Sequence, residues 1–339
     1  MAETVSLGVI GVGRIGRLHV QNIVSHIPQA RVLAVADVIE DAAKQVAASH
    51  GIPDAYGDPR FIMERDDIDA VVICSSTNTH ADLIEMAADA GKHAFCEKPL
   101  DLNVDRVRQV LKKVEAAGIK LQVGFQRRFD PSFRRARDLI AEGKIGEPHI
   151  VRITSRDPAP PPIEYIKVSG GIFLDMTIHD FDMSRFLLND EAAEIFAQGG
   201  VMVDPAIGEA GDLDTAVISM RFRNGALVTI DNSRRAVYGY DQRVEVFGSE
   251  GMIAVGNKLP DQVTWVNEAG QHRSKPVYFF IERYTEAYIA EMKAFVEAIL
   301  KDEQPAVSGF DGLAPVVMGY AAWQSYREHR PVLVELGNA

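Results

Sequence analysis

Cysteine is scarce in this chain, because its 339 residues include only Cys74 and Cys96. Both lie in apolar runs of the first half, so we expect free thiols of a reducing compartment rather than a disulfide framework. No spacing of cysteine and histidine residues resembles a zinc site, so no metal is expected. Basic residues are outnumbered too, with 36 Lys and Arg against 48 Asp and Glu and a net charge of −12. Such an acidic surface repels the phosphates of nucleic acid.

Long apolar runs are also missing. No stretch approaches the roughly 20 residues that span a bilayer, and the N-terminus leads directly into a strand pattern, so we expect neither a membrane anchor nor a signal peptide. The composition is that of a globular protein, 47% apolar and 25% charged, at a length sufficient for two domains. We therefore expect a cytoplasmic protein whose ligands are small molecules.

One glycine-rich stretch organises the chain, Gly11-Val12-Gly13-Arg14-Ile15-Gly16. It follows a short apolar run, Leu7–Ile10, and leads into a helical pattern. At such a strand-to-helix turn, Gly11 permits the tight turn, Gly13 lets a diphosphate approach the backbone, and Gly16 allows close packing of helix on strand. The free N–H groups at the helix start then face the phosphate charge.

An acidic residue follows at the position that a dinucleotide site requires. A second strand pattern, Val32–Ala36, ends in Asp37 about 20 residues after the last glycine. Its carboxylate can accept hydrogen bonds from ribose hydroxyls and repels a 2′-phosphate, so NAD is expected rather than NADP. The alternative interpretation is a glycine-rich turn that binds no ligand.

The rhythm of the chain predicts two domains. Strand and helix patterns alternate up to about residue 125, which indicates a doubly wound parallel sheet, so residues 1–125 are assigned to a Rossmann domain. Later segments alternate apolar and polar residues, with a hairpin signal at Asn224-Gly225. Residues 126–339 are therefore assigned to an α+β domain with an open, mainly antiparallel sheet, whose last helix is free to pack back on the first domain.

Polar residues that follow the parallel strands are candidates for the cofactor site, because ligands bind outside the carboxyl ends of such strands. The candidates beyond the glycine stretch and Asp37 are Val38, Ser75, Thr77, Asn78, His80, Glu97, Lys98 and Gln126. Thr77 or Asn78 can alternatively cap the next helix. Arg127 and Arg128 are equally compatible with a substrate role and with a salt-bridge cluster that joins the domains.

Two groups of residues carry candidate chemistry. Lys98 directly follows a buried strand and can hydrogen-bond a substrate hydroxyl, although a lysine after a strand is often only a solvated loop residue. The segment from Gly171 to about Leu188 has a helical pattern that places Asp175 and His179 on one face. An acid one turn before a histidine suits a proton acceptor, whereas the alternative is a buried polar pair that only links helices.

These residues together resemble the Gfo/Idh/MocA oxidoreductases. The resemblance rests on Gly11–Gly16, Asp37, Glu97-Lys98-Pro99, the segment Gly124–Asp130, and a glycine pair followed by Asp175 and His179. It implies a Rossmann domain joined to an open-sheet domain, with NAD as the cofactor. Within the family the chain looks most like the inositol 2-dehydrogenases, which oxidise a ring hydroxyl of myo- or scyllo-inositol to an inosose.

The resemblance also implies roles for particular residues. Lys98, Asp175 and His179 are expected to form the catalytic set, with either His179 or Lys98 as the proton acceptor. Further substrate contacts are expected from Arg127, Asp157, Tyr238 and Tyr240. The family further implies a homotetramer. Two other functions fit the same residues, a dehydrogenase of an aldose or another cyclic polyol, and a protein that senses NAD without turnover.

Overall fold

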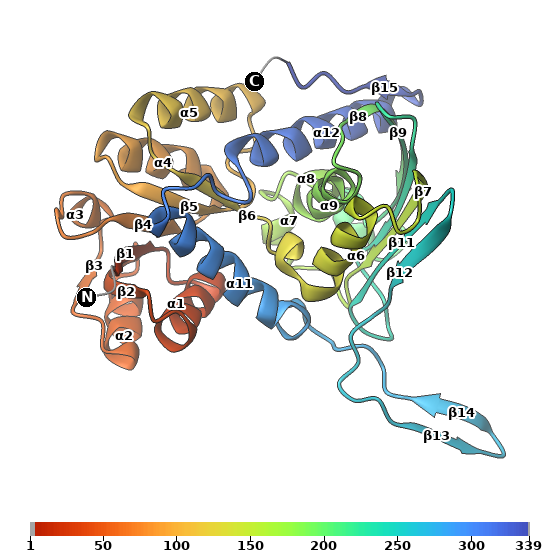
Figure 1. The fold of residues 1–339 in the computed structure, drawn as a ribbon, viewed down its shortest axis with the longest axis horizontal. Coiled ribbons are helices and arrows are strands. Elements are labelled where there is room, and N and C mark those ends of the chain that lie inside the picture. Colours follow the sequence, from red (N-terminus) through yellow and green to blue (C-terminus); the bar gives the residue numbers. More distant parts are fainter. Residues whose placement is uncertain (1–3, 338–339) are drawn as a thin grey trace. The chain divides into compact units, whose positions relative to one another are not determined.

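A computed structural model describes residues 4–337, which form two compact units. The first unit holds the described residues up to Phe129 together with Glu286–Ala314. The second holds Asp130–Thr285 together with the described residues from Pro315 onward. Figure 1 labels the helices and strands of both units.

The first unit is built on a six-stranded parallel sheet with the strand order β3-β2-β1-β4-β5-β6. Its strands are β1 (Val5–Ile10), β2 (Ala30–Ala36), β3 (Asp54–Tyr56), β4 (Ala70–Ile73), β5 (His93–Glu97) and β6 (Leu121–Gly124). Between them lie α1 (Arg14–His26), α2 (Glu40–His50), α3 (Arg60–Met63), the 3₁₀ helix η1 (Thr77–Thr79), α4 (His80–Asp89) and α5 (Val104–Ala117). The strand order reverses between β1 and β4, which confirms the doubly wound fold and marks the ligand-binding edge.

Continuous burial explains why these short apolar runs form parallel strands. All four residues of β4 are fully buried, as expected for a strand covered on both faces. A later helix, α11 (Phe280–Leu300), completes this core with Met292, Phe295 and Val296. Residues 286–314 return to the first unit, whereas the alternation of the sequence predicts a single second domain after residue 125.

The second unit contains a seven-stranded sheet with the order β12-β11-β7-β10-β9-β8-β15. All neighbours are antiparallel except β7 and β10, which confirms the expected mainly antiparallel sheet. The strands are β7 (Pro148–Arg156), β8 (Ala192–Gly200), β9 (Thr215–Phe222), β10 (Leu227–Ser233), β11 (Asp241–Gly248), β12 (Gly251–Val255) and β15 (Val332–Leu333). The predicted turn at Asn224-Gly225 joins β9 to β10, and Gly225 has a φ of +93° that favours glycine.

Helices cover one face of this sheet, so its strands alternate between buried and exposed residues. The helices of this unit are α6 (Pro131–Ala141), α7 (Ile163–Ile166), α8 (Ile172–Asp175), α9 (Ile178–Leu188) and α10 (Pro205–Glu209), together with α12 (Gly309–Glu328) from Pro315 onward. The 3₁₀ helix η2 (Gln126–Phe129) ends the first part of the first unit. In Figure 1, α9 lies against β7 and α6 against β12. Among the described residues, no helix is long and apolar enough to cross a membrane.

A separate pair of short strands, β13 (Thr264–Asn267) and β14 (Gly270–Arg273), forms a hairpin that pairs with neither large sheet. The side chains of β13 are all exposed. Trp265 stacks on His272 across the pair, with ring centroids 4.0 Å apart. A lone two-stranded hairpin is marginally stable in water, so the pairing of β13 with β14 contributes little stability by itself.

Candidate NAD and polyol site

The glycine stretch connects β1 to α1 as the sequence predicts. Gly11 has a φ of +86°, and a Cβ there would lie 2.6 Å from the backbone nitrogen of Ser75. A Cβ on Gly16 would collide with the carbonyl oxygen of Gly11, so the helix packs on the turn only with glycine. A Cβ on Gly13 would meet no atom within 4 Å. The backbone at Gly13 therefore stays open for the approach of a phosphate group.

Asp37 lies at the end of β2 beside this turn. Its Oδ2 accepts the N–H of Val12 at 2.8 Å and its Oδ1 accepts the N–H of Ile39 at 2.9 Å. Each carboxylate oxygen has a second lone pair, so Asp37 can still accept hydrogen bonds from ribose hydroxyls. Val38 is 90% exposed and Ile39 66% exposed. These apolar side chains offer a surface on which an adenine ring can pack.

The segment after β4 is tied to the segment after β5 by His80. Its side chain is buried, with Nδ1 2.8 Å from the carbonyl oxygen of Pro99 and Nε2 3.0 Å from that of Ser75. Both ring nitrogens contact backbone carbonyls, so His80 links the two segments and leaves no ring nitrogen for the cofactor. The alternative that Thr77 or Asn78 caps α4 is wrong, because the N-cap of α4 is Thr79, without a side-chain cap.

Glu97 is the last residue of β5, and Lys98 follows it directly at the ligand-binding edge. The Oε1 atom of Glu97 lies 2.7 Å from Nε2 of His19 on α1. Gln126 and Arg127 follow β6 on η2, and each is 5% exposed. These residues therefore collect at the carboxyl ends of β5 and β6, where the fold positions its ligand.

Arg128 differs from its neighbour Arg127, because its guanidinium is committed to an ion pair. Its Nη2 donates to Oδ1 of Asp311 at 2.9 Å, and both residues belong to the first unit. The Arg128–Asp311 pair therefore anchors the chain segment that returns to the first unit.

The helix expected from Gly171 to Leu188 is broken, which corrects the sequence analysis. Asp175 ends α8 and His179 is the second residue of α9, so the two do not lie on one continuous helix. At the break, the N–H of Thr177 donates to the carbonyl of Ile172, five residues back, at 2.9 Å. The hydroxyl of Thr177 contacts Oδ1 of Asn232 on β10 at 2.5 Å. This anchor to the sheet stops regular helical bonding between the two candidates.

Asp175 lies in a network that the sequence analysis missed. The hydroxyl of Tyr165 donates to Oδ1 of Asp175 at 2.7 Å, and Arg234 donates to its Oδ2 at 3.2 Å. Arg234, only 1% exposed, also reaches Asp212 at 3.3 Å. Asp212 in turn accepts the first N–H of α8, that of Ile172, at 2.8 Å. One buried arginine thus holds two carboxylates around the start and end of α8.

The charges of this network shift the pKa of its members. Burial alone would lower the pKa of Arg234, but the carboxylates of Asp175 and Asp212 raise it, so the guanidinium stays charged. Tyr165 is partly buried, 47% exposed, and its hydroxyl lies beside Asp175. That burial and the charge of Asp175 raise the pKa of Tyr165. Tyr165 therefore remains a hydrogen-bond donor to Asp175 at neutral pH.

The remaining substrate candidates fall in different places. The backbone of Asp157 bonds to Ser233 and Ala236 on either side of Arg234, at 2.9 and 2.6 Å. The negative charge of Asp157 contributes to the raised pKa values of Arg234 and Tyr165, so Asp157 belongs to the same charged neighbourhood.

Tyr238 and Tyr240 have other surroundings. The hydroxyl of Tyr238 donates to Asp241 at 2.5 Å and accepts from Arg156 at 3.2 Å. Tyr240 is 6% exposed, and its ring meets the edge of Tyr284 with centroids 6.1 Å apart. Tyr238 is therefore already held by a charged pair, and Tyr240 contributes to packing.

Models of two known domains match this chain. The oxidoreductase family with the NAD-binding Rossmann fold matches residues 5–125. The GFO/IDH/MocA C-terminal domain matches residues 133–254. Together the two matches cover well over half of the described chain, with the NAD-binding domain first and the C-terminal domain second.

Relatives match over almost the whole length. Myo-inositol 2-dehydrogenase of Thermotoga maritima is 50% identical over 329 residues, which cover 97% of this chain and 98% of that protein. A solved structure of a probable dehydrogenase from Thermotoga maritima has a TM-score of 0.96 at 50% identity, covering 98% of this chain and 99% of that one. Scyllo-inositol dehydrogenase from Lactobacillus casei, solved with NAD(H) and scyllo-inositol, has a TM-score of 0.92 at 32% identity, covering 98% and 99%. The chain therefore belongs to the GFO/IDH/MocA oxidoreductases, and its first unit carries the NAD-binding Rossmann fold of that family.

Proposed function

We propose that this protein oxidises one ring hydroxyl of myo- or scyllo-inositol to the inosose and transfers the hydride to NAD. The observation that carries the proposal is the 50% identity to a myo-inositol 2-dehydrogenase over 97% of the chain. The family's cofactor fits the first unit, which has an open glycine turn and an acidic residue at the end of β2. The nicotinamide supplies the hydride chemistry, and the protein supplies orientation and a proton acceptor.

In this proposal, His179 accepts the hydroxyl proton as the hydride leaves. An imidazole titrates near neutral pH, which suits a general base at physiological pH. Lys98 donates a hydrogen bond to the same hydroxyl oxygen, and it is the rival proton acceptor. The proton then leaves the hydroxyl oxygen, and the hydride leaves the carbon that bears this oxygen.

Asp175 has a different setting from the one that a continuous helix would give. Tyr165 and Arg234 both hold its carboxylate, so contacts from outside α8 and α9 help to set its position. We assign it two tasks, binding a substrate hydroxyl and stabilising the imidazolium that forms. Since Arg234 offsets its charge, Asp175 can do both without leaving an uncompensated carboxylate in the site.

The other proposed contacts with substrate and NAD follow from the surroundings of each residue. Asp157 is the best supported substrate residue, because it shares the charged neighbourhood of Asp175, while Tyr238, Tyr240 and Arg127 remain proposals. The proposed NAD contacts are Gly11, Gly13, Arg14, Ile15, Gly16, Asp37, Val38, Ser75, Thr77, Asn78, Glu97, Lys98 and Gln126. His80 is proposed to act on the cofactor only through the backbone of Ser75 and Pro99.

A panel of substrates tests the function directly. NADH formation is measured with myo-, scyllo- and D-chiro-inositol and with several aldoses, each with NAD and with NADP. We expect an inositol with NAD to have the highest kcat/KM, and the Lys98→Ala variant, with its lower expected kcat, serves for comparison. A preference for an aldose would assign the chain to sugar oxidation instead. Tight NAD binding without reduction by any polyol would indicate a protein that senses NAD.

We propose further that the exposed face of the second sheet packs on another copy of the chain, in a homotetramer. The register aligns an apolar row across four strands, formed by Met252, Phe247, Ile150 and Leu227. Met252, Phe247 and Leu227 are 54%, 48% and 51% exposed. A contiguous apolar row of this kind on a sheet face is typical of a protein interface.

The oligomeric state tests this surface. Light scattering with size-exclusion chromatography is expected to give a tetramer for the wild type and smaller species for Phe247→Arg. The matched control is Arg243→Lys, on the same strand and face but outside the row. A monomeric wild type would refute the tetramer. We also propose a cytoplasmic location, in keeping with two unpaired cysteines in the described chain.

A further inference from the structure

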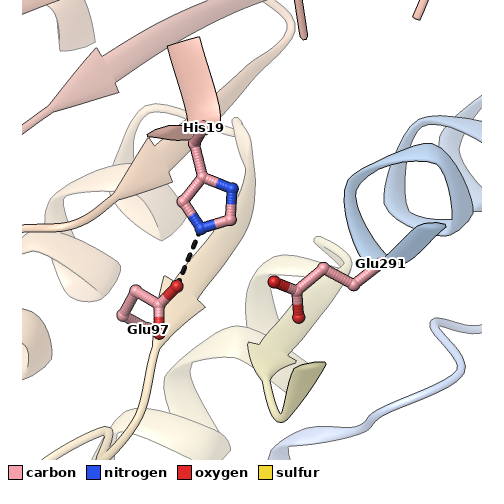
Figure 2. Close-up of side chains that lie close together, drawn as sticks. All are labelled: His19, Glu97 and Glu291. Carbon is pink, nitrogen blue, oxygen red and sulfur yellow. Dashed lines mark hydrogen bonds and ion pairs between the residues drawn. The ribbon is translucent and has the colours of Figure 1, made fainter. Parts of the chain in front are cut away.

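Three ionisable side chains meet inside the first unit. They are His19 of α1, Glu97 at the end of β5 and Glu291 of α11, and they lie within 4.8 Å of one another through their side-chain nitrogen and oxygen atoms. Figure 2 shows Glu291 directed from its helix toward the other two. His19 and Glu291 are fully buried, and the side chain of Glu97 is 14% exposed. The Rossmann fold does not require such a cluster, so it needs a role.

The His19–Glu97 pair connects the cofactor turn to the segment with Lys98. Its hydrogen bond of 2.7 Å joins the helix that follows the glycine turn to the residue before Lys98. The imidazole is held between the rings of Phe95 and Tyr288, with centroids 5.1 and 5.8 Å away. The pair is therefore fixed by packing as well as by its hydrogen bond.

Glu291 is the member without a partner. Neither of its carboxyl oxygens has a hydrogen-bond partner among the described residues, although its backbone carbonyl accepts from Gln122 at 2.7 Å. The ionisable groups next to the cluster, besides its own members, are Cys74 after β4, Cys96 on β5 and Tyr288 on α11. None of these is a fixed cation, so nothing compensates a second buried carboxylate next to Glu97.

The surroundings make the neutral acid the stable form of Glu291. Burial and the negative charge of Glu97 both raise the pKa of Glu291 well above its usual range. A neutral carboxylic acid carries an O–H group that must find an acceptor when it is buried. A carboxylate oxygen of Glu97 lies within 4.8 Å of one of Glu291, a separation that a direct hydrogen bond or one buried water can bridge.

A shared metal ion fits the cluster less well. Two ligand atoms of one zinc ion are separated by roughly 3.3 Å, given zinc–ligand distances near 2.1 Å. The 2.7 Å between Nε2 of His19 and Oε1 of Glu97 is instead a hydrogen-bond distance. The geometry thus favours hydrogen bonds within the cluster over a shared metal ion.

We propose that Glu291 is a neutral carboxylic acid whose hydroxyl donates to Glu97, and that it is a positioning residue for the adjacent Lys98. Glu97 then accepts two hydrogen bonds, one from His19 and one from Glu291. These bonds restrain the end of β5 where Lys98 begins. Space for this arrangement comes from Gly124 on β6, where a Cβ would lie 2.9 Å from the second oxygen of Glu97. The positioning role rests on the proposed function, whereas the protonation of Glu291 does not.

Two substitutions test whether Glu291 acts as a hydrogen-bond donor or only fills space. Glu291→Gln keeps the shape and an N–H donor, so we expect its kcat with inositol to stay within about twofold of the wild type. Glu291→Met keeps the length but donates nothing, so we expect kcat to fall about tenfold, the size of one hydrogen bond, with the KM for NAD nearly unchanged. Glu297→Gln, a half-exposed change on the same helix, is the control. Equal loss in both Glu291 variants would overturn the proposal, and so would full activity of Glu291→Met.

Two further measurements need no turnover. The wild-type minus Glu291→Gln infrared difference spectrum at pH 7 is expected to show the C=O band of a protonated carboxylic acid. A raised pKa in the folded state gives stability below the unfolded pKa, about 4.3, that is lost as the pH rises toward the folded value. The Tm of the wild type should therefore fall with rising pH relative to Glu291→Gln.

These outcomes distinguish the two proposals. No infrared band, no pH trend, or one bound metal ion per chain by elemental analysis would overturn the protonated state of Glu291. If no polyol is oxidised, the proposed function fails and the positioning role fails with it. The infrared band and the pH trend then still decide whether Glu291 is neutral.

Discussion

The two units of this chain assemble their sites in opposite ways. In the first unit, each candidate segment directly follows a strand, as Asp37 follows β2 and Lys98 follows β5. In the second unit, Asp175 is held by Tyr165 and by Arg234, and Arg234 lies 59 residues away. Neither partner stands in a recognisable motif with Asp175.

The difference has a topological cause. In a parallel sheet, the carboxyl ends of all strands lie at one edge, so position along the chain indicates position in space. In an antiparallel sheet, consecutive strands end at opposite edges, and the turns between them alternate sides. Residues that meet in such a unit therefore come from segments with no regular spacing.

The largest expected effect separates the two units by kinetics. His179→Ala should lower kcat about 10²–10⁴-fold, the usual loss for a general base, and leave the KM for NAD nearly unchanged. Lys98→Ala should lower kcat and also raise the KM for NAD, because Lys98 leaves a strand of the cofactor unit. Steady-state kinetics with an inositol and NAD measure both, and near-normal turnover of His179→Ala would make Lys98 the base.

A second substitution tests the long-range network of the second unit. Arg234→Met removes the buried cation that Asp175 and Asp212 share, so it should lower the free energy of unfolding by about 3–5 kcal/mol. Chemical denaturation followed by circular dichroism measures this loss. Arg235→Met is the matched control, since Arg235 is exposed and adjacent. A loss below 1 kcal/mol for Arg234→Met would show that the network is dispensable.

A third substitution acts only on the cofactor unit. Asp37→Ala removes the acceptor for ribose hydroxyls and the charge that repels a 2′-phosphate, so kcat/KM with NAD should fall about tenfold and the preference over NADP should shrink. Initial rates with both cofactors at fixed inositol concentration measure the change. The KM for inositol should stay constant, and equal efficiency of the wild type with NAD and NADP would contradict the assignment.

The smallest expected effect concerns a residue found only in the structure. Tyr165→Phe removes one hydrogen bond to the Asp175 carboxylate, and hydrogen bonds to charged groups contribute about 1.5–3 kcal/mol when fully buried. Because the ring is half exposed, we expect kcat to fall only about fivefold to tenfold. Tyr238→Phe, which loses a contact outside this network, should change kcat less. If Tyr238→Phe costs more, the polyol site lies nearer Tyr238.

Much of the first unit could be predicted, because its strands are continuous apolar runs and its turn chemistry is local. Among the elements of the second unit that were not predicted, β8 and α6 were missed for different reasons. In β8 the strand pattern fades into Gln198-Gly199-Gly200, which reads as a loop. For α6 a signal was present, since Asp130 caps the helix by accepting from Ser132 and Phe133, with Pro131 at the first turn.

The candidate site divides in the same way. Gly11, Asp37 and Lys98 could be found because each is marked by a strand that ends beside it. The break between Asp175 and His179 could not be found, because it depends on the bond from Thr177 to Asn232, which lies 55 residues further along the chain. The His19–Glu97–Glu291 cluster was hidden for a similar reason, since α11 returns to the first unit from far down the chain.

The placement of the two tryptophans makes this enzyme its own optical reporter. Trp323 is 9% exposed, packs edge-on against Phe173 at 4.9 Å and donates to the carbonyl of Gly170, two residues before α8. Trp265 is 53% exposed on the β13–β14 hairpin. Their fluorescence should therefore differ in wavelength and in access to a quencher such as iodide. Single Trp→Phe variants would give one signal for events beside Asp175 and another for contacts made by the hairpin, without any attached label.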